Sequence, residues 1–168
     1  MNMMHACEIP RDTGYFNFCN ICGSPLDADY FDVSSFQAAP ANVGQEIELA
    51  RHTLHPQYCG ALLYFAQYAE REEDSRQVFS ETPGYEWLIL CNSQPRSPYL
   101  PTSLILNAWC LNAFPVNLRL EEGCAVRLVV RKVNPPLGAK GITLSRVGGR
   151  LMGRSWYNAT YGGAPAPM

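Results

Sequence analysis

The sequence predicts an all-β protein, an antiparallel β-sandwich of jelly-roll-like type with an irregular N-terminal arm. Short runs in which apolar and polar residues alternate recur along the chain, as they do in strands that bury one face. The 13 prolines and 13 glycines divide these runs and favour many short elements over long helices. A chain of 168 residues can bury one core, and two packed sheets cover the apolar faces that a single sheet would leave in water.

The composition of the two ends differs from that of the middle of the chain. Met1–Asp32 mixes Asn, Asp, Gly and Cys with aromatic residues and shows no sustained periodicity. We therefore expect an extended N-terminal arm over residues 1–40, held by contacts outside its own core. The β-sandwich domain is expected over residues 41–161. Residues 162–168 are rich in Gly, Ala and Pro and are expected to form a flexible tail.

The first half of the sandwich domain contains four strand candidates. Gly44–Leu54 alternates, and Tyr85–Cys91 and Ser103–Leu111 are compact apolar runs bounded by turn residues. Ala61–Tyr68 is apolar and aromatic, which favours a buried strand. A helix that starts there and continues through Glu70–Arg76 is the alternative, and periodicity does not decide between the two.

The strongest strand pattern lies in Pro115–Val133. Two alternating runs flank a turn-like Glu-Glu-Gly at Glu121–Gly123. Because successive strand side chains point to opposite faces, the pattern predicts an antiparallel hairpin with one buried face and one basic, wetted face. The expected buried residues are Leu118, Leu120, Val126, Leu128 and Val130, and the expected basic ones are Arg119, Arg127 and Arg131.

A last hairpin is expected between Gly141–Val147 and Arg150–Tyr157. The pair Gly148-Gly149 between them suits the positive backbone dihedrals of a tight two-residue turn. With this hairpin the chain has about seven or eight short strands at fairly regular spacing, the pattern of a two-sheet sandwich or jelly roll.

Cys19 and Cys22, followed by Gly23, form half of a zinc knuckle. A tetrahedral site needs two more ligands, and His5 and Cys7 lie nearby in the sequence. The sequence has no second Cys-x-x-Cys, so a tight turn with unligated thiols is the simpler interpretation. We expect no cofactor, with zinc on these four residues as the alternative.

No combination of residues in the sequence predicts catalysis. The three histidines lie in no recognisable nucleophile or base context. The acidic run Glu70–Asp74 is interleaved with Arg71 and followed by Arg76, which is typical of a solvated loop. We therefore expect a protein that is not an enzyme.

The balance and position of charges predict protein contacts. The net charge is −2 and charged residues make up only 17% of the chain, which gives no overall attraction to nucleic acid. No apolar run approaches the roughly 20 residues of a membrane helix. Arginines concentrate in the C-terminal half, where they predict a subunit interface that meets acidic residues of a neighbour. The interface candidates are Arg127, Arg131, Arg150, Arg154, Trp156 and Tyr157.

Three segments resemble small jelly-roll virion proteins of tailed bacteriophages: Ile47–Tyr68, Val116–Val133 and Gly148–Tyr161. The resemblance extends over about two-thirds of the chain and is one of pattern. It implies a non-enzymatic capsid decoration (cement) protein in the virion, assembled in the host cytoplasm. It also implies homo-oligomers, often trimers, and an arm that reaches across neighbouring subunits. The implied partners are the major capsid protein or other virion proteins, and a connector or tail component is a related role.

Two alternatives belong to other functional classes. A receptor- or glycan-binding module on the same fold would use exposed aromatic residues such as Tyr99 or Trp156. A zinc-dependent enzyme or regulator would use Cys19 and Cys22.

Overall fold

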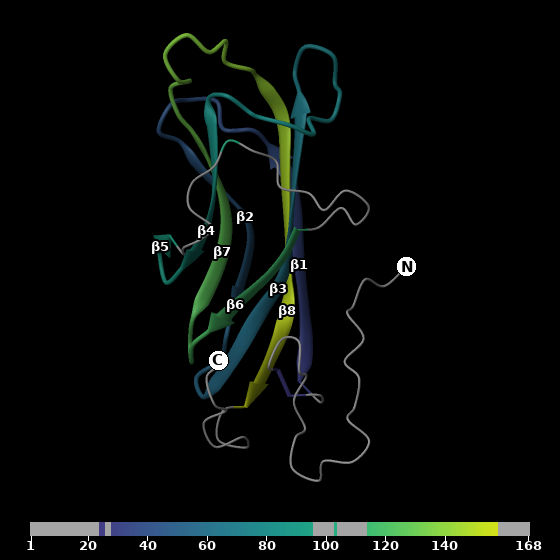
Figure 1. The fold of residues 1–168 in the computed structure, drawn as a ribbon, viewed down its shortest axis with the longest axis vertical. Helices are drawn as coiled ribbons and strands as arrows, with labels where there is room; N and C mark the ends of the chain where they lie inside the picture. The colour runs from purple at the N-terminus through teal and green to yellow at the C-terminus, as the bar shows by residue number, and fades with distance from the viewer. Residues whose placement is uncertain (1–23, 26–27, 96–102, 104–113, 158–168) are drawn as a thin grey trace.

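A computed structural model describes residues 24–25, 28–95, 103 and 114–157. In this part of the chain, eight strands form two four-stranded antiparallel sheets that pack face to face (Figure 1). We call them the β1 sheet, with strand order β1-β8-β3-β6, and the β2 sheet, with order β2-β7-β4-β5. The strands are β1 (Asp29–Ala38), β2 (Glu46–Thr53), β3 (Tyr58–Arg71), β4 (Tyr85–Cys91), β5 (Gln94–Pro95), β6 (Phe114–Leu120), β7 (Ala125–Lys132) and β8 (Leu144–Tyr157).

The connections give the sandwich the topology of a jelly roll. Every pair of consecutive strands except β4 and β5 lies in different sheets, so the chain crosses between the sheets at each of the other connections. The first and last strands are neighbours in the β1 sheet, so segments far apart in the sequence close the fold. Eight strands in two Greek-key sheets define this fold class. The predicted all-β, jelly-roll-like sandwich is therefore confirmed.

One apolar core fills the space between the sheets. Leu62 and Phe65 of β3 meet Trp87 of β4 and Leu128 of β7 in it, and all four side chains are almost completely buried. Burying an apolar side chain of this size contributes roughly 1.5–3 kcal/mol, so the core supplies the main driving force for packing. In the described ranges no helix has the length and hydropathy of a membrane span.

The predicted boundary of the N-terminal arm is wrong at its C-terminal end. Asp29–Ala38 is a strand that pairs along its whole length with β8, so the sandwich begins at β1 and not at residue 41. The physical reason is that successive side chains of this segment alternate between the two faces of a strand. Phe31 and Val33 face the core, while Tyr30 and Phe36 face outward. Residues 1–23 of the expected arm and the expected tail 162–168 lie outside the described residues.

The predicted last hairpin is also wrong. Gly148-Gly149 lies in the middle of β8, a single strand of 14 residues. A Cβ at Gly149 would lie 2.7 Å from Leu49 and Leu128 side-chain atoms, so this glycine lets the two sheets approach closely. The pair serves packing here and not a turn.

The predicted hairpin at Pro115–Val133 has the expected faces but not the expected pairing. Glu121–Gly123 forms a turn, with Gly123 at φ +66°. However, β6 pairs with β3 in the β1 sheet, while β7 pairs with β2 and β4 in the β2 sheet. The turn therefore connects the two sheets. Alternation cannot tell these cases apart, because strands of opposite sheets bury their residues in the same core.

The other strand predictions have mixed outcomes. β2 lies within Gly44–Leu54 and β4 occupies Tyr85–Cys91, as expected. Ala61–Tyr68 is part of β3, which confirms the strand and excludes the helix. The candidate strand Ser103–Leu111 lies outside the described residues except for Ser103, whose carbonyl accepts hydrogen bonds from Thr82.

Candidate functional site

A groove on the outer face of the β1 sheet combines exposed aromatic rings with charged and polar groups. Its volume is about 340 Å³, within the range of small-molecule sites. Strands β1, β3 and β8 contribute to it, together with Gln77 from the loop after β3. We call it the β1-sheet groove; its lining residues are Ser34, Phe36, Ala66, Gln67, Tyr68, Gln77, Gly148, Gly149 and Arg150.

A glycine positions the main aromatic ring of the groove. Phe36 of β1 and Gly148 of β8 are register partners, and a Cβ at Gly148 would overlap the Phe36 ring. The ring therefore packs onto bare backbone at Gly148, and it remains 59% exposed. It also meets Tyr68 of β3 edge to face, with centroids 5.3 Å apart and planes at 77°. This geometry is favourable for aromatic pairs and fixes the ring without burying it.

An ion pair lies beside the aromatic rings. Arg150 donates from Nε to Asp32 Oδ1 at 2.7 Å, and its Nη2 donates to Asp32 Oδ2. The hydrogen bond from Arg150 lowers the pKa of Asp32 below its ordinary value and outweighs the opposing effect of burial, and the positive charge of Arg150 adds to the lowering. Two parallel bonds orient the planar guanidinium. The pair thus presents a fixed arginine at the rim of the groove.

A hydrogen bond to Glu70 holds the hydroxyl of Tyr68. The Tyr68 hydroxyl donates to Glu70 Oε2 at 2.9 Å, and the Ser145 hydroxyl donates to Glu70 Oε1 at 3.1 Å. The hydrogen bond to the Glu70 carboxylate raises the pKa of Tyr68, with burial acting in the same direction. Tyr68 therefore stays protonated at neutral pH and keeps its ring oriented.

The groove has the chemistry of a binding surface. Its lining combines the apolar groups of Phe36, Ala66 and the ring of Tyr68 with the hydroxyl of Ser34 and the guanidinium of Arg150. Such a surface can bury an apolar or amphipathic group of a partner and orient it by hydrogen bonds.

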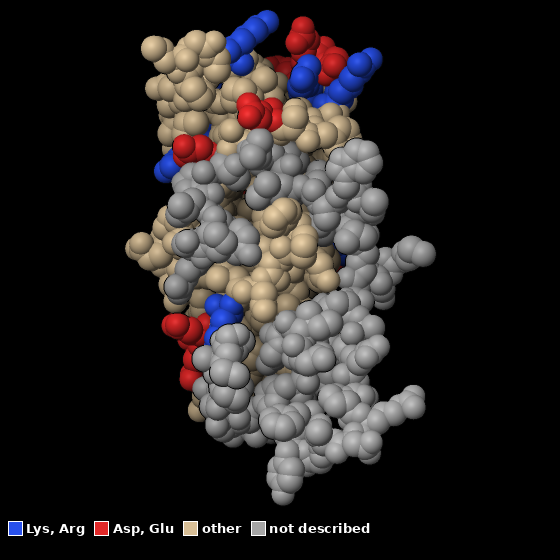
Figure 2. Space-filling model, viewed as in Figure 1, with Lys and Arg blue, Asp and Glu red and all other residues tan. Residues whose placement is uncertain are grey.

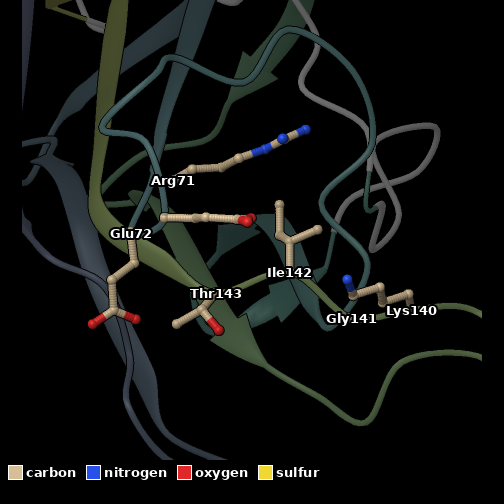
Figure 3. Close-up of a pocket in the computed structure, with 7 residues that line it drawn as sticks. Arg71, Glu72, Lys140, Gly141, Ile142 and Thr143 are labelled. Carbon is tan, nitrogen blue, oxygen red and sulfur yellow. The ribbon is translucent and has the colours of Figure 1, made fainter.

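A second cavity of about 440 Å³ lies at one end of the sandwich (Figure 3). Arg71, Glu72 and Glu73 from the end of β3 face Lys140–Thr143, the segment that leads into β8. Backbone bonds tie the two segments: the Glu72 N–H donates to the Thr143 carbonyl at 3.0 Å. On the face seen in Figure 2, acidic and basic side chains gather mainly at this end. The lining mixes both charges and contains no aromatic ring, so it resembles a solvated loop region more than a binding site.

The predicted interface arginines do not form one face. Arg127 and Arg131 are on the outer face of the β2 sheet, whereas Arg150 and Arg154 are on the outer face of the β1 sheet. Because the two sheets pack with their inner faces together, their outer faces are opposite sides of the sandwich. The four arginines therefore cannot all belong to one flat interface on a single face.

Most of these arginines meet carboxylates of the same chain. Arg127 Nη1 lies 3.4 Å from Glu48 Oε2, and Arg131 Nη2 lies 2.7 Å from Glu86 Oε2. Arg150 pairs with Asp32. The acidic N-terminal and basic C-terminal halves of the sequence thus neutralise each other across neighbouring strands. Whether these residues also contact another subunit stays a prediction.

The remaining interface candidates are less accessible than expected. Arg154 is only 2% exposed; its guanidinium lies 4.8 Å from the centroid of the Tyr30 ring and donates to the Ala28 carbonyl. Trp156 is buried in a small cluster with Cys59, Ala61 and Leu63 on the same outer face. Tyr157, the last candidate, is 37% exposed. Its hydroxyl donates to the Gln57 side chain, and its ring packs edge to face on Tyr58.

The predicted zinc ligands His5, Cys7, Cys19 and Cys22 lie outside the described residues, as does Tyr99. Within the described ranges, no group of three or more His, Cys, Asp or Glu side chains could hold a metal ion. His52 stacks flat on Phe31, with ring centroids 3.9 Å apart, and burial lowers its pKa, with His55 adding a smaller effect. The cysteines Cys59, Cys91 and Cys124 are buried.

The sequence did not indicate Phe36, Tyr68 and Gly148 as site residues. Phe36 lies in the part of the chain that was assigned to the arm, and Gly148 was assigned to a turn. The alternation of aromatic and polar residues in Asp29–Ala38 is the signal that could have revealed an exposed strand face.

Comparisons with protein-family models and with curated proteins found no match for this chain. The fold and the groove alone therefore describe the protein: it is a jelly-roll β-sandwich with a groove on one sheet that is lined in part by aromatic residues.

Proposed function

We propose that this protein is a non-enzymatic structural subunit of a virus particle, a capsid decoration protein that contacts its partners through the β1-sheet groove. Its partners are the major capsid protein or other virion proteins, and its place of action is the virion. A connector or tail component would use the same surface in the same way.

The observation that carries this proposal is the exposed, ordered Phe36 ring. A large aromatic side chain that stays 59% exposed on a regular strand costs free energy in water. Tyr30, on the same strand face, is 50% exposed. Ordered aromatic residues of this kind are typical anchors of protein interfaces, where a partner buries them.

Charge and fold add support. Arg127, Arg131 and Arg150 have carboxylate partners within the chain, whereas the Phe36 ring lies exposed in the groove. Jelly rolls include viral capsid and lectin domains. Fold similarity is an analogy and does not assign function, whereas the groove is a feature of this chain.

The proposal is tested by binding to particles. Particles assembled without the protein are incubated with purified wild-type protein or with Phe36→Ala, and bound protein is measured after sedimentation. We expect the substitution to weaken binding at least tenfold, because it removes an interface anchor. The matched control is Phe79→Ala, which removes a phenylalanine that is 69% exposed and does not line the groove.

Two results would contradict this role. One is the absence of the protein from purified particles. The other is equal binding by wild-type protein and Phe36→Ala, which would exclude the groove as the contact.

The groove also favours a second candidate, a glycan-binding module. Aromatic rings pack against the C–H faces of sugars, while hydroxyl, amide and guanidinium groups such as those of Ser34, Gln77 and Arg150 bind sugar hydroxyls. Trp156 is too buried to take the part expected for it in such a module. Binding to a glycan array that is lost in Phe36→Ala and kept in Phe79→Ala would favour this candidate over the particle role.

A further inference from the structure

We propose that β1 pairs antiparallel with β1 of a second copy of this chain, so that the β1 sheet continues across a two-fold axis. This proposal rests on the proposed role as an assembly subunit, and it names a second copy of the chain as one partner. It concerns the open edge of β1, the side that faces away from β8.

In the described part of the chain the sheets have four edge strands, and three of them carry features that block further pairing. β5 has only two residues, one of them Pro95. β6 contains Pro115, which has no N–H to donate. β2 has a bulge between Glu48 and Ala50. Short length, proline and bulges are the devices by which proteins protect sheet edges.

The edge of β2 is covered in another way as well. The Ser35 hydroxyl donates to the Leu49 carbonyl, and the Gln37 side-chain amide donates to the Glu48 carbonyl. These bonds come from the inward face of β1, so β1 itself occupies part of the β2 edge. Among the described strands, none pairs with the outer edge of β1.

β1 carries none of these protective devices. Its register with β8 runs without a shift over ten residues, and its sequence, DYFDVSSFQA, contains no proline, lysine or arginine. Its central acidic residue, Asp32, is neutralised by Arg150. Its other acidic residue, Asp29, lies at the first position of the strand. A long, regular edge with few charges is the kind that pairs with another strand.

The backbone of β1 is directed correctly for such pairing. The Ala39 N–H donates to the Ser145 carbonyl at 3.0 Å, which continues the β1–β8 register. In an antiparallel ladder, alternate residues direct both peptide groups to the same neighbour. The odd-numbered residues of β1 therefore bond to β8. The even-numbered ones, from Tyr30 to Ala38, direct their N–H and C=O groups to the open edge.

One register about a two-fold axis satisfies the side chains best. It places Tyr30 opposite the partner's Phe36, Asp32 opposite the partner's Ser34, and Val33 on the axis opposite the partner's Val33. Both aromatic pairs lie on the outer face, where Tyr30 and Phe36 are exposed in the single chain. Cross-strand aromatic pairs are among the stabilising pairs of antiparallel sheets. Shifting the register by two residues in one direction would bring Asp32 opposite the partner's Asp32, which disfavours that arrangement.

Pairing in this register also changes the β1-sheet groove. The partner's Tyr30 would lie beside Phe36, so each groove gains an aromatic wall from the other copy. The two grooves then lie on one continuous sheet surface, related by the two-fold axis. A dimer would therefore present a paired aromatic surface to the particle.

The first test measures the oligomeric state of the full chain by light scattering and sedimentation velocity. We expect the wild-type protein to have twice the mass of one chain and Ser34→Pro to have the mass of one. Proline at this position removes an N–H that points to the open edge and leaves the bonds to β8 in place. Ser34→Ala keeps the N–H and is the matched control, expected to stay dimeric.

A second test determines which residues of the two β1 strands lie opposite each other, and it does not depend on the folding of Ser34→Pro. Val33→Cys places one thiol of each copy at the axis, where opposed residues of an antiparallel pair are close enough for a disulfide. Mild oxidation followed by peptide mapping should show a covalent dimer joined through residue 33. Ser35→Cys, which lies off the axis, should show no such dimer.

The outcomes separate this proposal from the proposed function. A wild-type monomer, a dimer unaffected by Ser34→Pro, or a failure of Val33→Cys to cross-link would overturn the pairing of β1 edges. A monomer that still binds particles through Phe36 would leave the particle role intact. A dimer that cross-links through residue 33 but binds no particle would support the pairing and remove the particle role.

Discussion

The two sheets bury the same core but expose different outer faces. The β1 sheet presents Phe36 and Tyr68 in a groove, with the exposed Tyr30 on the same face and the Arg150–Asp32 ion pair beside the rings. On the β2 sheet, Arg127 pairs with Glu48, and Arg131 pairs with Glu86. Close to these ion pairs, Leu88, Leu90 and Val129 form a small buried cluster.

The two outer faces differ in how their side chains are held. On the β2 sheet, charged side chains join neighbouring strands, and its edges carry a bulge and a proline. On the β1 sheet, glycines in β8 let aromatic rings of β1 lie on the backbone and stay in place. Ordered apolar surface next to an unprotected strand edge is a combination that association with another molecule would bury.

The largest expected effect comes from a glycine of β8. At Gly153 a Cβ would overlap both the Ala61 carbonyl oxygen and the Phe31 ring, and the carbonyl cannot move without distorting β3. We expect Gly153→Val to lower the free energy of unfolding by about 3 kcal/mol or more. Urea denaturation followed by tryptophan fluorescence measures it.

Gly138→Ala is the control for this prediction. Gly138 has φ +84° and no atom within 4 Å of a built Cβ, so alanine there meets only backbone strain. Its cost should be about 1 kcal/mol. Equal destabilisation by the two substitutions would show that contact at Gly153 is not what makes glycine necessary.

An intermediate effect should distinguish the two faces of β7. Leu128 points into the main core, whereas Val129 belongs to the cluster on the outer face, and both are fully buried. We expect Leu128→Ala to cost about 2–5 kcal/mol, because it opens a cavity between two packed sheets. Val129→Ala removes fewer carbons, and at about 0.8 kcal/mol per methylene it should cost less than 2 kcal/mol. Thermal and urea unfolding of both variants measure the loss in the free energy of unfolding. A larger loss for Val129→Ala than for Leu128→Ala would contradict this order.

The smallest expected effect is the pH dependence of the ion pair on the β1 sheet. Arg150 lowers the pKa of Asp32, so the folded state holds its proton less tightly than the unfolded state does. The pair therefore stabilises the fold above the ordinary pKa of Asp, and this contribution is lost as the pH falls through the lowered value. Because both side chains are about half exposed, the effect should stay below about 1 kcal/mol.

Comparing wild-type protein with Asp32→Asn in urea between pH 6 and pH 2 measures this contribution. The difference in stability should be largest near neutral pH and should shrink on acidification. Glu86→Asn, which breaks the ion pair on the β2 sheet, shows how the opposite face behaves. A difference that grows as the pH falls would mean that the sign assigned to Asp32 is wrong.

Much of the architecture was predictable because its signal is local. The alternation in Leu118–Leu120 and Val126–Val130 identified two strands and their buried faces, and Gly123 marked the turn between them. The same alternation did not reveal that the two strands belong to different sheets. At Gly148-Gly149, glycine suits both a tight turn and a close packing contact. The sequence alone therefore favoured the turn, which is the commoner role of a glycine pair.

The candidate site was less predictable, because its parts come from distant segments. Tyr68 and Gly148 were both recognised as strand-region residues, but Phe36 was assigned to an arm. Asp32 and Arg150 are 118 residues apart, and the sequence suggested only that acidic and basic residues would meet. It pointed to a neighbouring subunit, whereas the strands of one chain bring them together.

By itself, the sequence determined that this protein is a β-sandwich, where most described strands lie and which of their side chains face the core. Period-two alternation and turn residues are properties of a few consecutive residues, so they can be read without a structure. Only the tertiary structure decided that β1 pairs with β8, that β6 and β7 separate, and that Phe36, Tyr68 and Gly148 form a groove. Strand partners are selected by packing and hydrogen bonding across the whole chain, and no local pattern contains that information.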